Sequence, residues 1–412
     1  MADLPLPVPT IDDAPAWVAE HLGGLYAESP GPVPVSGAFT GGQAAADAAL
    51  GLYDVSGYAR TRSEVLPVGR RGASRLSPYI RHGLLPLPRV WAAVGDGPAR
   101  DRTKFRDELL WQEYSRHLYA RLGAATARPL RYAPAVAAGT PWEDPWPRDM
   151  ACMDLVVGEL EDDGWLVNQT RMWMSAHWTV RAGWDWRAGE DRFFTHLLDG
   201  SRAANRLGWQ WTIGAGTGKA YGFSRWQTEK RAPGLCGRCA LRDACPIEDW
   251  PDDATAPARL PEPSPLLRSD PDVERTAGPS TTAELGEPEA VWLTAESLGD
   301  EDPALAAHPD LPAVFVLDRE LLRGWQLSGK RLVFLAQTLA DLGARRPLEV
   351  WLGDPVSVLS GRPVAATFTP VPGWRRRAAA IRPAVVHPWP WLVRPHTGSI
   401  GSFSAWRKRA SR

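Results

Sequence analysis

The sequence predicts an α + α/β protein in which a helical part comes first and a small parallel α/β layer follows. Three observations predict this class. Apolar residues recur at helical spacing from residue 1 to about 250, with no alternating strand pattern. A stretch rich in Pro, Asp, Ser and Ala follows at 251–288, and from Ala290 short β-rich runs alternate with helical runs. We therefore predict domains at 1–250 and 289–412, joined by a linker at 251–288.

The composition is typical of a soluble globular chain. Its 412 residues suffice for two cores, and 44% of them are apolar. The net charge of −1 excludes a uniformly basic nucleic-acid binder, although a local basic groove is compatible with it. No segment approaches the roughly 18–20 apolar residues of a membrane span. The start, MADLPLPVPTIDD, lacks the pattern of a secretory signal, so we expect a cytoplasmic protein that contacts no membrane.

Helical spacing is clearest in TKFRDELLWQEYSRHLYARLG. Its apolar and aromatic positions follow a period close to 3.6, at Phe105, Leu109, Trp111, Tyr114 and Leu118. GWLVNQTRMWMSAHWTVRAG and EDRFFTHLLDGSRAANRL show the same spacing, and we expect a helix over each. The chain has 21 Trp residues. Most should pack in cores, and the surplus also fits a protein that stacks rings on bases or passes electrons between indoles.

The α/β layer is predicted from runs after Ala290. AVWLT, AVFVLD and LEVWLGDP are expected strands, and KRLVFLAQTLADLGAR is an expected helix that ends at Gly343. PVAATFTP, a basic helix around Trp374–Ile381 and AVVHPWPWLV follow. The linker before them cannot bury enough apolar surface to fold alone, so we expect it to be partly disordered.

The cysteines indicate a metal site. Three lie in LCGRCALRDACPI, and the chain has four in all: Cys152, Cys236, Cys239 and Cys245. Clustered thiols in a cytosolic chain bind a metal more often than they form disulfides. Four thiolates hold zinc or an iron–sulfur cluster, and the spacing alone does not separate the two. Cys152 lies far upstream, and it could equally be a small buried apolar residue.

Several motifs resemble the photolyase/cryptochrome family. SRLSPY is similar to the segment that holds the flavin pyrophosphate, where hydroxyls and main-chain N–H groups suit an anion. The resemblance assigns this contact to Ser74, Arg75, Leu76 and Ser77. Upstream, YARTR supplies Tyr58 as a flavin contact and Arg62 as a DNA-phosphate contact. Ala73 stands where the family often has Thr, which removes one hydroxyl.

Two further helical motifs carry the expected lesion site. ELLWQEYSRHL resembles a family helix in which Glu108 would hydrogen-bond the damaged bases and Trp111 would stack on them. Gln112 replaces the usual DNA-contacting Arg. GWLVNQTRM matches a motif that assigns Asn168 and Arg171 to the flavin and lesion pocket. This region lacks the catalytic His of (6-4) photolyases, which favours cyclobutane pyrimidine dimers as the substrate.

DGSRAANRLGWQW is the most specific match. The resemblance implies that Asp199 pairs with Arg171, that Asn205 faces flavin N5 and that Trp209 is the first electron donor. Ser201 replaces an Asp that commonly lies beside the flavin. Trp186, in DWRAGE, matches the second Trp of the electron relay, while the third Trp has no obvious counterpart. Gln227 stands where the family has a DNA-contacting Gln.

The cysteine pattern resembles the iron–sulfur branch of bacterial photolyases, which implies a [4Fe–4S] cluster, although the last spacing is short. The C-terminal part resembles the Rossmann-like antenna domain that opens ordinary photolyases, and GSFSAWRKRA resembles that domain's exit. The order of the domains therefore resembles a circular permutation, which surface termini and a long linker allow. The α/β part is short, which is compatible with the absence of an antenna chromophore, and the identity of any such chromophore stays unknown.

The resemblance implies a monomeric, light-driven photolyase that uses FAD to split cyclobutane pyrimidine dimers in DNA. The cofactor carries the chemistry, and the protein binds and orients the extruded lesion. One alternative is a cryptochrome-like photoreceptor without repair activity, favoured by the changes at Ala73, Gln112 and Ser201. A second is a nucleic-acid binding module without photochemistry, which would need an emptied pocket.

Overall fold

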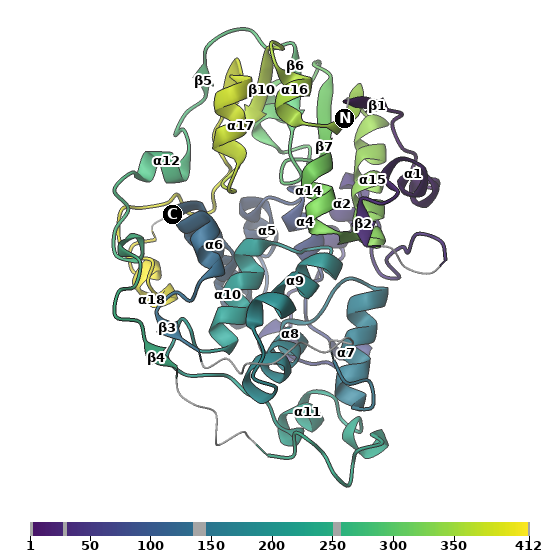
Figure 1. Ribbon diagram of the computed structural model, residues 1–412, viewed down its shortest axis with the longest axis vertical. Helices are drawn as coiled ribbons and strands as arrows, with labels where there is room; N and C mark the ends of the chain where they lie inside the picture. Colours follow the sequence, from purple (N-terminus) through teal and green to yellow (C-terminus); the bar gives the residue numbers. More distant parts are fainter. Residues whose placement is uncertain (1–2, 28–30, 135–145, 250–256, 411–412) are drawn as a thin grey trace.

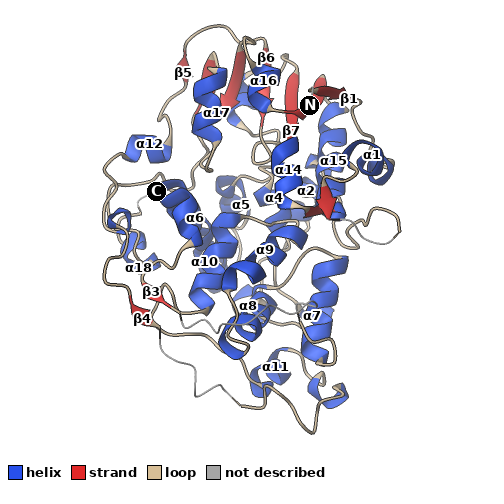
Figure 2. Cartoon of the chain, in the orientation of Figure 1, coloured by secondary structure: helices blue, strands red, loops and turns tan. Residues whose placement is uncertain are grey.

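The computed structural model describes residues 3–27, 31–134, 146–249 and 257–410. The labelled strands of the large sheet, such as β6, β7 and β10, lie at the top of the molecule, and helices such as α7, α8 and α11 lie at the bottom (Figure 1). Colouring by secondary structure shows the same division (Figure 2). The predicted α + α/β class is confirmed. No helix among the described residues is long and apolar enough to cross a bilayer.

The sheet has the order β1-β9-β7-β6-β10-β11-β5. Its strands are β1 (Leu4–Leu6), β5 (Ala283–Glu284), β6 (Ala290–Leu293), β7 (Ala313–Asp318), β9 (Leu348–Gly353), β10 (Val364–Thr367) and β11 (Val385–His387). The five central strands are parallel and follow the doubly wound order 3-2-1-4-5. They are continuous apolar runs because helices cover both faces of such a sheet. These helices include α13 (Pro303–Ala307), α14 (Arg319–Trp325), α15 (Gly329–Gly343), α16 (Pro355–Leu359) and α17 (Trp374–Ile381).

The N-terminus corrects one expectation. No strand was predicted before residue 250, yet β1 pairs antiparallel with β9, with Pro5 opposite Trp351. The helix α1 (Ala14–Leu22) packs on α15 through buried Trp17 and Val18. A three-residue strand is too short to show alternation, so the pattern missed it. Residues 3–22 therefore pack with the α/β layer, while the division at 250 and 288 stays a prediction.

The helical part contains the predicted helices with one correction. Its helices are α2 (Gln43–Gly51), α3 (Tyr58–Thr61), α4 (Ser77–Arg81), α5 (Leu87–Ala93), α6 (Ala99–Leu122), α7 (Ala151–Asp162), α8 (Asn168–Ala176), α9 (Trp186–His196), α10 (Arg202–Thr212) and α11 (Arg225–Arg231). Short turns are η1 (Val68–Arg70), η2 (Gly123–Ala127), the π-helical η3 (His177–Arg181) and η4 (Cys236–Arg238). The run from Glu190 to Leu207 is two helices, because the chain turns at Asp199–Gly200 and restarts after Ser201.

The predicted linker is folded where the structure describes it, and its residues 251–256 lie outside the described part. It forms η5 (Pro265–Leu267), α12 (Val273–Ala277) and the edge strand β5. Leu267 and Ala277 are buried, and Asp270 pairs with Arg121 at 3.0 Å, both side chains buried. The expectation of disorder is therefore wrong for residues 257–288. Composition missed these contacts because they are made with α6, far away in sequence.

Smaller elements tie distant segments together. These are the pairs β2 (Tyr26–Ala27) with β8 (Leu327–Ser328) and β3 (Tyr132–Ala133) with β4 (Ala258–Arg259), and the C-terminal helix α18 (Phe403–Arg407). α18 packs on α6, where Tyr114 donates a hydrogen bond to the carbonyl of Ile400 at 2.8 Å. The C-terminal segment therefore lies against the helical part.

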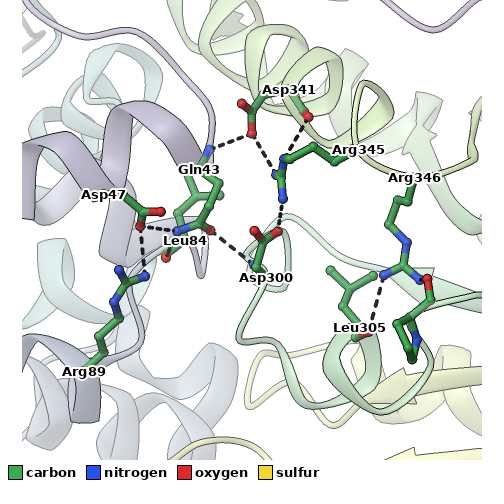
Figure 3. A network of polar contacts seen from close by, with 10 residues as sticks. Gln43, Asp47, Leu84, Arg89, Asp300, Leu305, Asp341, Arg345 and Arg346 are labelled. Carbon is green, nitrogen blue, oxygen red and sulfur yellow. Dashed lines mark hydrogen bonds and ion pairs between the residues drawn. The ribbon is translucent and has the colours of Figure 1, made fainter.

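A polar network joins α2 to the α/β layer (Figure 3). The Gln43 N–H donates to Asp341 at 2.8 Å, and the Gln43 side-chain oxygen accepts from the Asp300 N–H at 3.2 Å. Arg345 pairs with both Asp341 and Asp300. Gln43 is 3% exposed, so its amide must find partners, and they come from both parts of the chain. This junction fixes the helical part against the sheet.

Candidate functional site

A cavity of about 960 Å³ lies between the helical part and the carboxyl edge of the sheet. One wall comes from α6, α8 and α10, and we call it the helical wall. The other, the α/β wall, comes from α15 and from residues that follow β6, β7 and β10. β6 and β10 flank the point where the strand order reverses, where ligands of doubly wound sheets bind. The volume suits a ligand of cofactor size.

The helical wall holds the predicted ion pair. Arg171 of α8 donates to Asp199 at 2.7 Å, and Asp199 is 8% exposed. The Asn205 side-chain nitrogen and the second Asp199 oxygen are buried without a partner among the described residues. Buried polar groups of this kind are nearly always satisfied. Both residues line the cavity, so these atoms are available to a ligand there.

The SRLS segment lines the same cavity. Ser74, Arg75 and Ser77 line the cavity, whereas Leu76 is fully buried in the core and does not. Arg75 has φ +60°, an uncommon backbone conformation for a residue other than Gly that is often found at functional sites. Ser77 accepts a hydrogen bond from the Trp165 indole at 3.0 Å and can still donate one. The segment therefore offers hydroxyls and a cation to an anionic ligand.

The rim of the cavity carries the predicted lesion and DNA residues. Glu108 pairs with Lys104 at 2.8 Å and with Arg62 at 3.4 Å. Tyr58 and Gln112 also line the cavity. Burial raises the pKa of the Tyr58 hydroxyl, which therefore stays protonated. Trp111 lines the cavity while its ring stacks on Phe403, with centroids 3.9 Å apart and an interplanar angle of 10°.

Asn168, Ser201 and Trp209 also line the cavity, and the roles that the motifs assign to them stay predictions. Asn168 opens α8, and Ser201 stands just before α10, so helix starts position both. Trp209 lies against α9 at Gly189, where a Cβ would come within 2.1 Å of its ring. This contact requires glycine at position 189. Trp186 and Gln227 do not belong to the cavity lining, and their predicted roles stay predictions.

Two arginines that line the cavity, Arg331 and Arg81, were not predicted from the sequence. Arg331 of α15 is 6% exposed and donates to the carbonyls of Phe194 and Gly200. Burial, with Arg81 next, lowers the pKa of Arg331 to about 9, so the guanidinium stays charged near neutral pH. Arg81 pairs with Glu296 at 2.8 Å. The available sequence signal for this residue was a basic position, Arg331, within the otherwise apolar run KRLVFLAQ.

The four cysteines lie around a separate cavity of about 20 Å³. Cys152 comes from α7, Cys236 from η4, and Cys239 and Cys245 from the following turns. Burial raises the pKa of the Cys152 thiol to about 12, and the three neighbouring cysteines add to this. The Ala151 N–H points at the Cys239 sulfur at 3.4 Å. Among the described residues, no three His, Cys, Asp or Glu side chains converge tightly enough to hold one metal ion.

The chain is similar to known proteins over part of its length. The family model described as "FAD binding domain of DNA photolyase" matches residues 105–231, which include α6, α8 and α10. The chain is 32% identical over 229 residues to a deoxyribodipyrimidine photo-lyase of Thermus thermophilus, covering 53% of this chain and 51% of the relative. It is 28% identical over 162 residues to one from Synechococcus, covering 35% and 33%. The chain thus spans between a third and about half of the length of these relatives.

Solved structures are similar in part. A class III photolyase from Agrobacterium tumefaciens aligns with a TM-score of 0.40 and 23% identity, over 53% of each chain. A cryptochrome from Synechocystis aligns with a TM-score of 0.42 and 20% identity, over 55% of each chain. Both TM-scores lie below 0.5.

Proposed function

Because this chain belongs to the photolyase/cryptochrome family, we propose that it is a light-driven DNA repair enzyme that uses FAD to split cyclobutane pyrimidine dimers. The observation that carries the proposal is the set of unpaired buried groups in the large cavity. The Asn205 amide and the free Asp199 oxygen face a space of cofactor size, and arginines line it. The amide, the carboxylate and the cations together match the donors, acceptors and charge of a flavin with its pyrophosphate.

These residues fit FAD as follows. Ser74, Arg75 and Ser77 would hold the pyrophosphate through hydroxyls and charge. Asn205 and Asp199 would meet the polar edge of the isoalloxazine, with the ion pair to Arg171 holding the Asp199 carboxylate in place. When bound, reduced FAD would supply the light-driven one-electron chemistry that opens the dimer.

The rim fits a damaged base pair turned out of the helix. Trp111 offers a flat apolar surface, and Glu108 offers carboxylate oxygens that accept from base N–H groups. Arg62 and Lys104 hold Glu108 in place and carry positive charge toward a phosphate. A lesion has already lost part of its stacking, so extruding it costs less than extruding a normal pair.

We assign the cysteine cavity to a [4Fe–4S] cluster. In such a cluster each iron binds one thiolate, so the four sulfurs stand around a cage and do not converge on one ion. Four cysteines from three segments around a common space suit this arrangement. Iron and sulfide analysis tests it, with about four of each per chain expected. A protein with one zinc and no iron would contradict it.

We also propose that an antenna chromophore binds on the sheet side of the cavity. The proposal includes a permuted domain order, in which the antenna domain is the C-terminal one. Trp374 and Trp389 line the cavity, and their indole N–H groups are buried without a partner among the described residues. Such groups suit a planar ligand with acceptor atoms. Chromatography of ligands released by denaturation tests this, because a second chromophore beside FAD is expected. A release of FAD alone would remove this part of the proposal.

The repair assay decides between a photolyase and a photoreceptor. The protein is reduced with dithionite, mixed with an oligonucleotide containing one thymine dimer and illuminated, and restored thymine is measured. We expect light-dependent recovery that falls by about 10²-fold in Glu108→Ala. Glu161→Ala is the matched control, because Glu161 pairs with two cations, Arg148 and Arg192, and none of these three residues lines the cavity. Flavin binding without any recovery would favour the photoreceptor.

A further inference from the structure

Two histidines meet near the β5 edge of the sheet, outside both cavities. His387 is the last residue of β11, and His308 directly follows α13. Their Nε2 atoms are 3.1 Å apart, and their ring centroids are 5.2 Å apart. Neither residue lines the large cavity or the cysteine cavity. The pair therefore lies apart from the proposed flavin, lesion and cluster sites.

The main chain around His308 is held by one arginine. The guanidinium of Arg346 donates to the His308 carbonyl at 2.6 Å, and also to the carbonyls of Pro309 and Leu311 at 3.1 and 2.7 Å. On the other side, the His308 N–H donates to the Ala304 carbonyl of α13 at 3.2 Å. These bonds fix the backbone that carries the His308 ring, so the ring does not depend on a ligand for its place.

The ring of His387 is oriented from the neighbouring strand. β5 pairs antiparallel with β11, and the register that sets Val385 opposite Glu284 places Thr282 opposite His387. The Thr282 hydroxyl lies 3.3 Å from His387 Nδ1. When Nδ1 carries the proton and donates it to this hydroxyl, His387 Nε2 keeps its lone pair and directs it toward the other histidine.

From this geometry we propose that His308 and His387 bind one divalent metal ion of the kind that imidazole prefers, such as Zn²⁺. A Zn–N bond measures about 2.0–2.1 Å, so two nitrogens 3.1 Å apart subtend an angle of about 100° at the ion, between octahedral and tetrahedral values. The ring centroids would then be about 4.8 Å apart, a change of about 0.4 Å from the present 5.2 Å. The ion takes the place of the proton that the two nitrogens now share.

The surroundings keep the His387 ring in the form that binds metals. Burial, with the neighbouring His308 next, lowers the pKa of His387, which is only 7% exposed. Its imidazole is therefore neutral near neutral pH, and a metal ion does not have to displace a proton from Nε2. His308 is half-buried, so an ion can enter from solvent on its side.

The remaining positions around the ion are open. Among the described residues no third His, Cys, Asp or Glu converges on the pair. Glu284 is exposed and stands two residues from Thr282, on the same face of β5 and diagonally across from His387. Its carboxylate can turn toward the ion, and water takes the positions that are left.

Such an ion would join three segments of the chain. His308 belongs to the loop after α13, and His387 belongs to β11. Thr282 precedes the edge strand β5, which has only two residues, Ala283 and Glu284, and gains little from its own pairing. Because the ion binds only when these segments are assembled, it stabilises the folded state.

The test uses the full protein with its own cofactors, stripped of loose metal by a chelator and desalted. Zn²⁺ is titrated by calorimetry into the unaltered protein, His308→Ala, His387→Phe and His21→Ala. His21 is the matched control, because it is also a half-buried histidine, and its ring packs edge-on against Trp17 of α1. Co²⁺ then replaces Zn²⁺, because cobalt bound to thiolates gives intense charge-transfer bands and cobalt bound to imidazole does not. This distinguishes the histidine pair from the four cysteines.

We expect the unaltered protein and His21→Ala to bind one more Zn²⁺ per chain than His308→Ala and His387→Phe. The cobalt difference spectrum should show only weak bands, without thiolate charge transfer. Thr282→Val should weaken binding about tenfold, because groups that orient a metal-bound histidine contribute about 10–100-fold to affinity. Thr282→Ser keeps the hydroxyl and should restore the affinity.

Equal zinc stoichiometry in the unaltered protein and His308→Ala would overturn the proposal, and so would a cobalt difference spectrum dominated by thiolate bands. His308→Ala and Thr282→Val change half-buried side chains, so they decide the question even when His387→Phe does not fold. The result does not depend on the repair function, because none of these residues lines the large cavity.

Discussion

The helical wall and the α/β wall of the large cavity differ in how their charges are balanced. On the helical wall, Arg171 pairs with Asp199. On the α/β wall, Arg331 donates to two carbonyls and forms no ion pair with a described carboxylate. The helical wall therefore supplies this ion pair and an unpaired amide, and the α/β wall supplies, beside its own Arg377–Asp318 pair, a guanidinium that no described carboxylate pairs. The difference indicates that an anionic ligand completes the site from the space between the walls.

The largest effect is expected from Asp199→Ala, which removes the ion pair of the helical wall. Asp199→Ala leaves the Arg171 guanidinium, which is only 20% exposed, without its partner. Removing one member of a buried pair costs about 3–5 kcal/mol, and partial exposure reduces this to about 2–4 kcal/mol. Urea unfolding and flavin titration measure the change, and flavin affinity should fall together with stability. Asp191→Ala is the control, because Asp191 is 63% exposed and pairs with Arg202 at the surface. A similar loss in both variants would contradict the account.

Arg331→Met tests the α/β wall and should have the next largest effect. It leaves the carbonyls of Phe194 and Gly200 without a donor, which costs about 1–3 kcal/mol. Gly200 adjoins Asp199, so flavin affinity should fall about tenfold. Lys330→Met is the matched control, since Lys330 is equally buried and donates to the Glu161 carbonyl at 2.7 Å, outside the cavity. Loss of flavin in Lys330→Met alone would show that the wall assignment is wrong.

Phe403→Ala tests how Phe403 holds Trp111 at the rim of the cavity. The ring of Phe403 stacks on Trp111, and such pairs contribute about 0.5–1.5 kcal/mol beyond burial. Without it Trp111 loses its fixed orientation, so affinity for dimer-containing DNA should fall several-fold while flavin content stays the same. Fluorescence anisotropy with labelled DNA measures this, and Phe403→Trp should keep the affinity. If Phe403→Ala binds this DNA as tightly as the unaltered protein, then Phe403 does not orient Trp111 for DNA binding.

Glu113→Gln should leave flavin binding unchanged and alter only the pH dependence of stability. Glu113 accepts from the Val393 N–H at 3.0 Å, outside the cavity lining, and Arg116 lies 3.9 Å away. Burial raises the pKa of its carboxyl from 4.5 to about 7. The folded state therefore holds this proton more tightly, and stability falls as pH rises from 4.5 through 7. Urea unfolding at pH 5.5 and 7.5 should show a smaller fall in the variant, and an equal fall would contradict the assignment.

The two walls also differ in how far the sequence predicts them. Motif residues on α6, α8 and α10 could be placed because three- and four-residue spacings put them on one helical face, and the Arg171–Asp199 pair follows from that. Arg331 could not be placed, because its contacts with Phe194 and Gly200 join segments over 130 residues apart. The stacking of Phe403 on Trp111 was missed for the same reason.

The fold shows the same limit. Parallel strands such as β7 and β9 were predicted because whole runs of apolar residues mark them. The strand β1 and the packed linker were not, since each depends on partners far along the chain. The periodicity of apolar residues indicates which face of an element is buried, but it does not indicate which other element covers that face.

The flavin content of the purified protein tests the central claim most directly. The protein is denatured, the released ligand is identified by chromatography and mass, and its amount is compared with the protein concentration. The account predicts one FAD per chain from the cavity, lost in Asp199→Ala and weakened in Arg331→Met. A protein that carries no flavin and takes up none from an excess of FAD would contradict it.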